Sequence, residues 1–447
     1  MMRKRSRRRR LAATGRWRAR KLRAPLAVVR RRAATLVGAV LLSFAALLFA
    51  IAGDWAQRHF ASIAKTYTYA PLLTTPLLFA TVAWFTRRWV PAAGGSGIPQ
   101  VIAASGNIEG AATSPLLSLR TAVAKLALTV TVLFGGGSVG REGPTVQLAA
   151  AIMVAVHRVL RVPISAGVLI AGGAAGVAAA FNTPLAGVAF AIEELAAAYE
   201  QRVALLVMGA VVISGLVSLS LAGDYIYFGA MRDTLAIGPL LLVAPTVAVI
   251  GGGLGGLFAR LVLGFGRASH RWLEGKWVRS VLLAAGCGLI VAALGVTSGG
   301  ASWGTGYEAT RTMVEGQGQP LWFGPVKFLA TLATTLSGTP GGIFAPSLSV
   351  GAGVGNLLTP LFPSQPAGTI VLLGMVAYFV GVVRAPLTAV IILMETTASR
   401  GMILPLFATA LLADATSAFV CRERLYHGLA RRFAPVVRVS DDAKTPG

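Results

Sequence analysis

The sequence predicts an all-α polytopic membrane protein made of two internally repeated helical halves, and three observations support this fold class. Of the 447 residues, 55% are hydrophobic and 13% are charged, which is about half the charged fraction of a typical soluble domain. Apolar runs close to membrane-spanning length recur along the whole chain. Breaks rich in Gly and Pro fall at matching places in the two halves, as in transporters whose helices are broken near the bilayer midplane.

A basic segment, residues 1–32, is dense in arginine and immediately precedes the first apolar run. Positive charge beside a membrane helix favours the cytoplasmic side and contact with anionic lipid. No nucleic-acid-binding module adjoins the segment, so we expect no nucleic-acid partner. The following apolar run is long and lacks a clear cleavage site, so we expect a retained, disordered, cytoplasmic segment rather than a signal peptide.

The first half, about residues 33–222, should cross the membrane several times. After a first span, a short loop near 54–65 should lie outside, and Arg87 with Arg88 should mark a cytoplasmic end. Breaks follow at 94–99, at 135–144 and at 181–184, where glycine, asparagine or proline interrupts the apolar sequence. The expected apolar runs are 33–52, 70–86, 119–134, 145–156, 164–180, 185–195 and 203–222.

The second half, about residues 235–420, repeats this plan, and the transmembrane domain as a whole should cover residues 33–430. Its main break is at 341–346. The expected apolar runs are 235–262, 281–296, 321–336, 347–358, 369–383, 386–396 and 402–420. A short basic tail, 431–447, should be cytoplasmic.

The two halves align without gaps at an offset of 202 residues (327 minus 125). The matched positions include Lys125 with Lys327, Gly140 with Gly342, Pro144 with Pro346, Gly172 with Gly374, Pro184 with Pro386, and Glu193 with Glu395. Agreement of Lys, Pro, Gly and Glu positions at one offset exceeds what apolar composition alone produces. We expect inverted halves, which requires an odd number of crossings in each; the sequence leaves that number open.

The most unusual stretch is Gly140-Arg141-Glu142-Gly143-Pro144, which places a carboxylate and a guanidinium inside hydrophobic sequence. An ionisable residue at membrane depth is costly and indicates a functional site. Glycine allows the chain to break, and Pro144 suits the first turn of a new helix. The free N–H groups and positive dipole end of that helix would favour an anion, so the stretch predicts an anion site.

Three motifs together resemble the signature motifs of the CLC chloride channel and transporter family, also called the voltage-gated chloride channel family. They occur in the family's order and spacing, and the resemblance covers roughly residues 33–430. The motifs are Gly95-Ser96-Gly97-Ile98-Pro99, Gly140-Arg141-Glu142-Gly143-Pro144 and Gly342-Ile343-Phe344-Ala345-Pro346. Three linked motifs are a specific signal, whereas any one of them alone would be weak.

The resemblance implies a role for individual residues. A central chloride would bind the Ser96 hydroxyl, the backbone amides of Ile343 and Phe344, and the hydroxyl of Tyr426. Glu142 would be the gating carboxylate and outer proton site, and Glu194 would be the inner proton site. The other motif residues would form the anion pathway: Gly95, Gly97, Ile98, Pro99, Gly140, Arg141, Gly143, Pro144, Gly342, Ala345 and Pro346.

The resemblance also implies the activity and its setting. The presence of Glu194 favours coupled chloride/proton antiport of the bacterial exchanger type, by a secondary transporter rather than an enzyme, with chloride and protons as transported ions and no cofactor or metal. We expect a homodimer with one pathway per subunit, in a bacterial inner membrane, with both termini cytoplasmic. The chain ends about 21 residues after Tyr426 (447 minus 426), so we expect no paired regulatory nucleotide-binding modules. Gln100 stands where many relatives carry an acid.

Three alternatives remain. A passive voltage- or pH-gated chloride channel, or an exchanger of another anion such as fluoride, would use the same fold; Ser96 favours chloride by the family pattern. The stretch Gly94-Gly95-Ser96-Gly97 also fits an intramembrane serine protease, which needs a histidine base. The histidines His59, His157, His270 and His427 all fall at loops or membrane edges.

Several charged residues have a structural interpretation. Arg141 is more typical of a structural partner, binding carbonyl groups or an acid, than of a direct anion ligand. Lys125 and Lys327 have two interpretations: they bind polar groups at helix ends, or they raise the electrostatic potential around the anion pathway. Glu193, Glu395 and Asp414 are expected to hydrogen-bond near helix ends.

Overall fold

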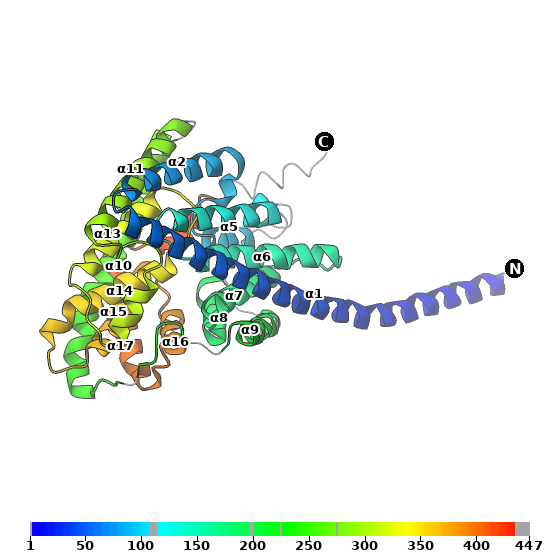
Figure 1. The fold of residues 1–447 in the computed structure, drawn as a ribbon. Coiled ribbons are helices and arrows are strands. Elements are labelled where there is room, and N and C mark those ends of the chain that lie inside the picture. The colour runs from blue at the N-terminus through cyan, green and yellow to red at the C-terminus, as the bar shows by residue number, and fades with distance from the viewer. Residues whose placement is uncertain are drawn as a thin grey trace.

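The computed structural model describes residues 2–106, 114–195, 201–223, 226–231, 233–273 and 276–433. Within these ranges the fold is helical, and the only β-type pairing among the described residues is one isolated bridge (Figure 1). The predicted tail, 431–447, lies outside the described residues beyond Phe433.

The helices of the first half are α1 (Met2–Thr66), α2 (Pro71–Trp89), α3 (Ile98–Ser105), α5 (Leu119–Phe134), α6 (Glu142–Val159), α7 (Ala166–Phe181), α8 (Pro184–Phe190) and α9 (Gln201–Ala222). Short 3-10 turns cover Pro91–Ala93 and Pro115–Leu117, and a π-helical turn covers Ala191–Leu195. The predicted run 119–134 is α5 itself.

The helices of the second half are α10 (Ile237–Leu273), α11 (Trp277–Thr297), α12 (Tyr307–Val314), α13 (Phe323–Leu336), α14 (Phe344–Leu358), α15 (Ala367–Val383), α16 (Pro386–Thr397), α17 (Ile403–Val420) and α18 (Leu425–Ala430). Among the described helices, five are long and apolar enough to cross a membrane: Val29–Thr66, Ala204–Leu221, Ile237–Ser269, Trp277–Thr297 and Ile403–Val420. The shorter helices between them fit the predicted pattern of broken helices.

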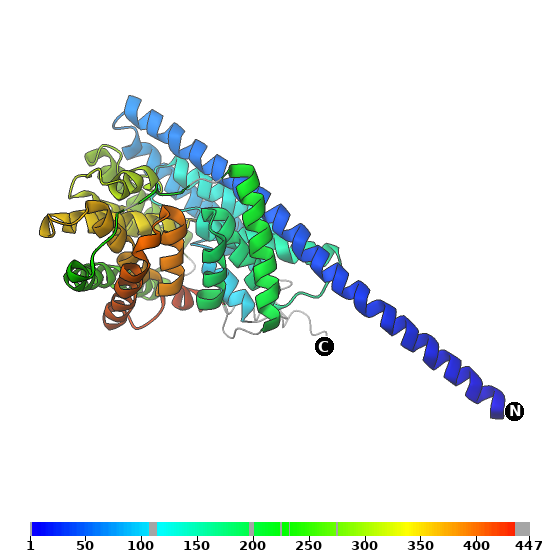
Figure 2. The same cartoon turned by 90° about the horizontal axis from the view of Figure 1, so that it is seen from below.

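Helix α1 is longer at both ends than the sequence predicted. The basic segment predicted as disordered is helical from Met2, and its free end extends beyond the body of the protein (Figures 1 and 2). Arginine, lysine, alanine and leucine all have high helix propensity, which accounts for this difference. The predicted loop near 54–65 is also helical, and Asp54 there is bonded to Arg141.

The internal repeat predicted from the sequence is confirmed by the helices. At the offset of 202 residues, the pairs are α1 with α10, α2 with α11, α5 with α13, α6 with α14, α7 with α15, α8 with α16, and α9 with α17. Packing follows the same rule, since α6 packs on α7 as α14 packs on α15. The pairs α2 with α11 and α8 with α16 pack directly against each other across the two halves.

An approximate two-fold axis passes between Gly140 and Gly342. The amide of Gly140 donates to the Gly342 carbonyl, the amide of Gly342 donates to the Gly140 carbonyl, and both distances are 2.7 Å. The two strands of chain run antiparallel at this bridge. The breaks of the two halves therefore meet at one point, with α6 and α14 starting on either side of it.

A second reciprocal contact involves the paired acids of the repeat. Glu193 accepts hydrogen bonds from Thr388 (2.7 Å) and the preceding amide at the start of α16. Glu395 accepts them from Ala186 (2.8 Å) and the preceding amide at the start of α8. Each carboxylate satisfies free N–H groups at a helix N-terminus. The predicted structural role of Glu193 and Glu395 is thereby confirmed.

Close helix packing surrounds the breaks because glycine removes the side chain at the contact. A Cβ atom at Gly374 on α15 would lie 2.5 Å from the carbonyl oxygen of Gly351 on α14. At the equivalent Gly172 on α7, a Cβ atom would lie 2.9 Å from Cα of Ala150 on α6. Both helices of each pair can therefore approach at backbone distance, as small residues allow in membrane proteins.

Candidate functional site

The site begins with Glu142, the first residue of α6, whose side chain is fully buried. Its Oε2 atom accepts a hydrogen bond from the Ala345 amide in the first turn of α14, at 3.4 Å. A Cβ atom at Gly140 would collide with this carboxylate, so glycine is needed there. The carboxylate thus lies at the N-terminal end of α14, where a helix offers free N–H groups to an anion.

Two buried hydroxyl groups lie beside this carboxylate. Ser96 Oγ and Tyr426 Oη are both buried, and neither makes a hydrogen bond within the described part of the chain. Ser96 Oγ lies directly against Gly143, because a Cβ atom at that glycine would overlap it. The Tyr426 phenol lies close to the Ser96 hydroxyl, and the charge of the Glu142 carboxylate acts on it. Buried polar groups in native proteins normally have partners, so two unpaired hydroxyls side by side indicate a polar ligand site.

Aromatic rings hold the start of α14 in place. The ring of Phe344 lies 5.8 Å from that of Tyr426, 4.9 Å from Phe379, 5.9 Å from Phe190 and 6.4 Å from Phe181, measured between centroids. All five side chains are buried. The helix N-terminus therefore sits in apolar surroundings where its partial charges are weakly screened.

The sequence prediction that Ser96, Glu142 and Phe344 share one place is confirmed by these contacts. Gly97 completes the approach: its φ is +115°, and a Cβ atom there would overlap the Gly143 carbonyl oxygen. Only glycine adopts this backbone readily at such a contact. The starts of α3, α6 and α14 consequently meet around one small volume.

A cavity of about 510 Å³ opens onto this place from one side of the molecule. Ser96 and Ile343 lie in its wall, and Arg87 and Arg432 line it as well. Gln100, also in the wall, donates to the Gly94 carbonyl at 2.7 Å. The neutral amide at this position thus contributes to holding the loop that carries Ser96, and the cavity presents cations rather than carboxylates to an anion.

Glu194 lies on the π-helical turn that follows α8. The sequence predicted a single run through 185–195, and the structure divides it into α8 and this turn; π-turns of this kind often occur at functional sites. The Glu194 side chain is 0% exposed. Its Oε1 atom is 3.4 Å from Nδ1 of His427, and within the described residues neither carboxylate oxygen has a hydrogen bond.

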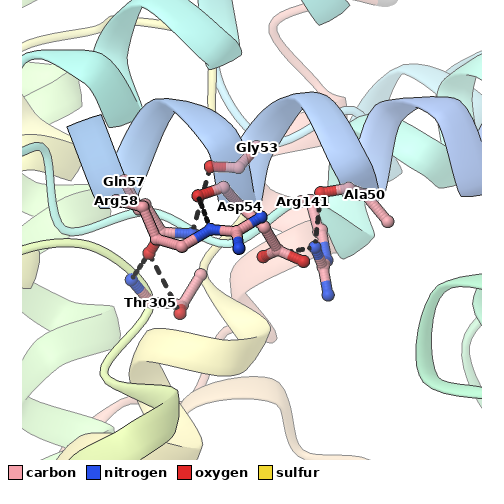
Figure 3. Close-up of polar contacts among 7 residues, drawn as sticks. All are labelled: Ala50, Gly53, Asp54, Gln57, Arg58, Arg141 and Thr305. Atoms are coloured by element: carbon pink, nitrogen blue, oxygen red, sulfur yellow. Dashed lines mark hydrogen bonds and ion pairs between the residues drawn. The ribbon is translucent and has the colours of Figure 1, made fainter. Parts of the chain in front are cut away.

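Arg141 has a structural partner, as predicted. Its Nη1 atom donates to Asp54 Oδ1 and to the Ala50 carbonyl, each at 2.9 Å (Figure 3). On the next turn of α1, Gln57 Oε1 accepts hydrogen bonds from the amide and hydroxyl of Thr305 (Figure 3). These contacts attach α1 to the break of its own half and to the segment before α12.

The two matched lysines bind loop carbonyl groups. Lys125 Nζ donates to Gly95 at 2.9 Å, beside the loop that carries Ser96. Lys327 Nζ donates to Ser302 at 2.9 Å and to Gly304 at 2.7 Å. Both side chains are fully buried. Of the two interpretations of these lysines, the contacts favour support of the backbone.

These elements define a class: an all-helical, multi-pass membrane protein whose two repeated halves aim helix N-termini at a buried polar site. A family model described as voltage gated chloride channel matches residues 77–418. The chain therefore belongs to the voltage-gated chloride channel (CLC) family, whose members are transporters or channels rather than enzymes.

Solved structures share this fold. A slow cyanobacterial Cl⁻/H⁺ antiporter matches with a TM-score of 0.78 and 22% sequence identity, over 91% of this chain and 98% of that chain. A CLC-type fluoride/proton antiporter matches at 0.75 and 22%, over 89% and 96%. A eukaryotic CLC transporter matches at 0.72 and 21%, over 90% and 74%.

The serine-protease alternative finds no support in the site. Among the described hydrogen bonds and ion pairs, His59 is bonded to Trp55, His157 to Met153, and His427 faces Glu194. Ser96 Oγ has no histidine partner within the described residues. The contact of His427 with Glu194 could not be predicted from the sequence, because the two residues are 233 positions apart (427 minus 194).

Proposed function

We propose that this protein exchanges chloride for protons across a membrane, with Glu142 as the outer proton site and gate and Glu194 as the inner proton site. The observation that carries the proposal is the position of the Glu142 carboxyl group at the N-terminus of α14, an anion-binding position, where its Oε2 atom accepts the Ala345 amide. A side chain that occupies an anion position and can be neutralised by a proton connects the two ions.

Chloride would bind between the Ser96 and Tyr426 hydroxyls and the amides of Ile343 and Phe344. These groups carry partial charges, so they can replace water around the ion without holding it too tightly for release. The absence of a hydrogen-bond partner for either hydroxyl among the described residues supports this assignment. Arg87 and Arg432 in the cavity wall would raise the local chloride concentration before binding.

Proton coupling would follow from competition at one place. The ionised Glu142 carboxylate repels chloride and occupies the α14 terminus. The protonated side chain is neutral, so it does not repel chloride, and it leaves the terminus. Binding of a proton at Glu142 and binding of chloride beside it therefore favour each other, and this coupling is reciprocal. Glu194, buried on the π-helical turn beside His427, would provide the second protonation step.

We further propose that the protein is a homodimer in a bacterial inner membrane with both termini in the cytoplasm. The arginine-rich start of α1 and the basic residues near Arg87 and Arg432 support this orientation by the positive-inside rule. The same basic start of α1 would contact anionic lipid.

Purified wild-type protein in liposomes with a chloride gradient and a pH electrode tests the proposal. Chloride moving down its gradient should drive protons uphill, and the movement should stop when an uncoupler is added. Chloride flux with no proton movement would make the protein a passive channel. Proton movement driven by fluoride but not by chloride would make it a fluoride exchanger.

A further inference from the structure

We infer that His427 carries protons between the aqueous phase and Glu194, an inference that rests on the proposed exchange of chloride for protons. The pair is defined by geometry: His427 Nδ1 lies 3.4 Å from Glu194 Oε1. The Glu194 side chain is 0% exposed, whereas the His427 side chain is 45% exposed. The imidazole thus lies between a fully buried carboxylate and water.

No other proton donor reaches this carboxylate in the described part of the chain. Both Glu194 oxygens lack hydrogen bonds there, and its sequence neighbour Glu193 is committed to the start of α16. A buried carboxylate that has to gain and lose protons needs a route to water. Imidazole suits that route because it binds protons near neutral pH and has two nitrogen atoms that can exchange them on opposite sides.

The proposed transfer conserves protons and charge. A proton from water binds the nitrogen of His427 that faces solvent and gives an imidazolium. The proton on Nδ1 then passes to the Glu194 carboxylate and leaves a neutral imidazole and a neutral carboxylic acid. Direct transfer requires about 2.6–3.2 Å between heavy atoms or one bridging water, so the imidazole must approach by a few tenths of an ångström. Rotation of the ring or exchange with water restores the starting tautomer.

The residues around the pair lie on α18, on the helices packed against it and on the π-helical turn. Helix α18, which carries His427, packs on α3, α10 and α15, and α3 has no titratable side chain. The charged and titratable groups that act on Glu194 are His427, Arg424 and Glu193, and Glu194 acts in turn on Tyr426. The helices packed against α18 carry Arg260, Arg267, His270 and Arg271 on α10, and Tyr378 on α15. Arg267 and Arg431 are both bonded to Glu423. Arg424 is a cation close enough to act on Glu194.

The location of His427 also connects the proton route to the anion site. Tyr426 and His427 are consecutive on α18, so one short helix presents a hydroxyl to the Ser96 site and an imidazole to Glu194. A small displacement of α18 would move both groups together. Proton entry at Glu194 and anion binding at Tyr426 would then be linked through the same helix.

The test compares wild type with His427→Phe, His427→Gln and His427→Lys in liposomes that report proton and chloride movement. Phenylalanine keeps the bulk over Glu194, glutamine keeps a polar group, and lysine keeps a cation; none relays protons as imidazole does. Chloride-driven proton uptake should fall about tenfold or more in all three. His59→Gln, an exposed histidine on α1, is the matched control and should pump as wild type does.

The same substitutions in the Glu142→Ala background distinguish a loss of proton transfer from a general loss of folded, chloride-conducting protein. Chloride flux there no longer depends on protons, so His427→Phe should leave it within twofold of Glu142→Ala alone. Full proton pumping by His427→Phe, or by His427→Lys, would overturn the inference, the latter by showing that only a positive charge is needed. Equal loss of flux in both backgrounds would also overturn it. Absence of proton movement in wild type would instead refute the proposed function itself.

Discussion

At the scale of single residues, the site depends on glycines that leave space for polar groups and on cations that are bonded to carbonyl groups. Gly140 leaves room for the Glu142 carboxylate, Gly143 leaves room for the Ser96 hydroxyl, and Gly97 leaves room for the Gly143 carbonyl oxygen. Lys125 binds the Gly95 carbonyl beside the Ser96 loop, and Arg141 binds the Ala50 carbonyl on α1. The proposed anion site therefore contains hydroxyls, amides and one carboxylate, whereas Lys125 and Arg141 are bonded to backbone carbonyl groups.

We predict that Glu142→Ala abolishes proton coupling while chloride flux persists, because the competing carboxylate and its proton are both lost. Chloride flux in wild type should rise as the pH falls, since protonation removes the competing charge, and this pH dependence should be absent from the variant. Liposome flux measured across the pH range checks both points. Uphill proton movement at the wild-type rate in Glu142→Ala would refute the assigned role.

We predict that Glu194→Gln slows or stops proton movement and leaves chloride binding intact, because within the described residues Glu194 makes no hydrogen bond to any of the proposed chloride ligands. Isothermal titration calorimetry should give a chloride affinity within about threefold of wild type, while chloride-driven proton uptake is lost. Glu193→Gln serves as a comparison: it removes charge from a capped helix start, so it should lower thermal stability. Loss of chloride binding in Glu194→Gln would contradict the assignment.

At the scale of helices, glycine contacts and reciprocal caps set the position of the breaks. Helices α7 and α15 are buried almost throughout and pack on α6 and α14 at backbone distance. Both end in residues with left-handed backbone, Asn182 at φ 57° and Arg384 at φ 62°. Arg384 also binds Asp414 at 3.0 Å, which confirms the predicted structural role of that acid. The matched helices α7 and α15 thus end with the same backbone conformation and also cover equivalent residues.

We predict that Gly374→Ala destabilises the protein by about 1–3 kcal/mol, because the added methyl group would overlap backbone atoms of α14. Thermal unfolding in detergent should show a lower midpoint than wild type. Gly286→Ala on α11 is the control, since no atom lies within 4 Å of a Cβ there. An unchanged midpoint for Gly374→Ala would mean that α14 and α15 separate without cost.

At the scale of the whole molecule, the repeat was predictable because both copies carry the same Lys, Pro, Gly and Glu positions. The convergence of Ser96, Glu142 and Phe344 was predictable only through the family resemblance, since segments so far apart give no local signal of contact. The acceptors of Lys125 and the caps made by Glu193 and Glu395 required coordinates. The contact of His427 could not be predicted because its partner lies on another element. The basic segment was predicted to be disordered from its charge, whereas its residues have high helix propensity.

The central claim is that a halide and the Glu142 carboxylate occupy the same place at the start of α14. Anomalous diffraction from bromide-soaked crystals of wild type and Glu142→Gln at neutral pH tests it most directly. The account predicts a bromide peak beside the amides of Phe344 and Ala345 in Glu142→Gln that wild type lacks. Bromide at that place with equal occupancy in both proteins, or at neither, would contradict the claim.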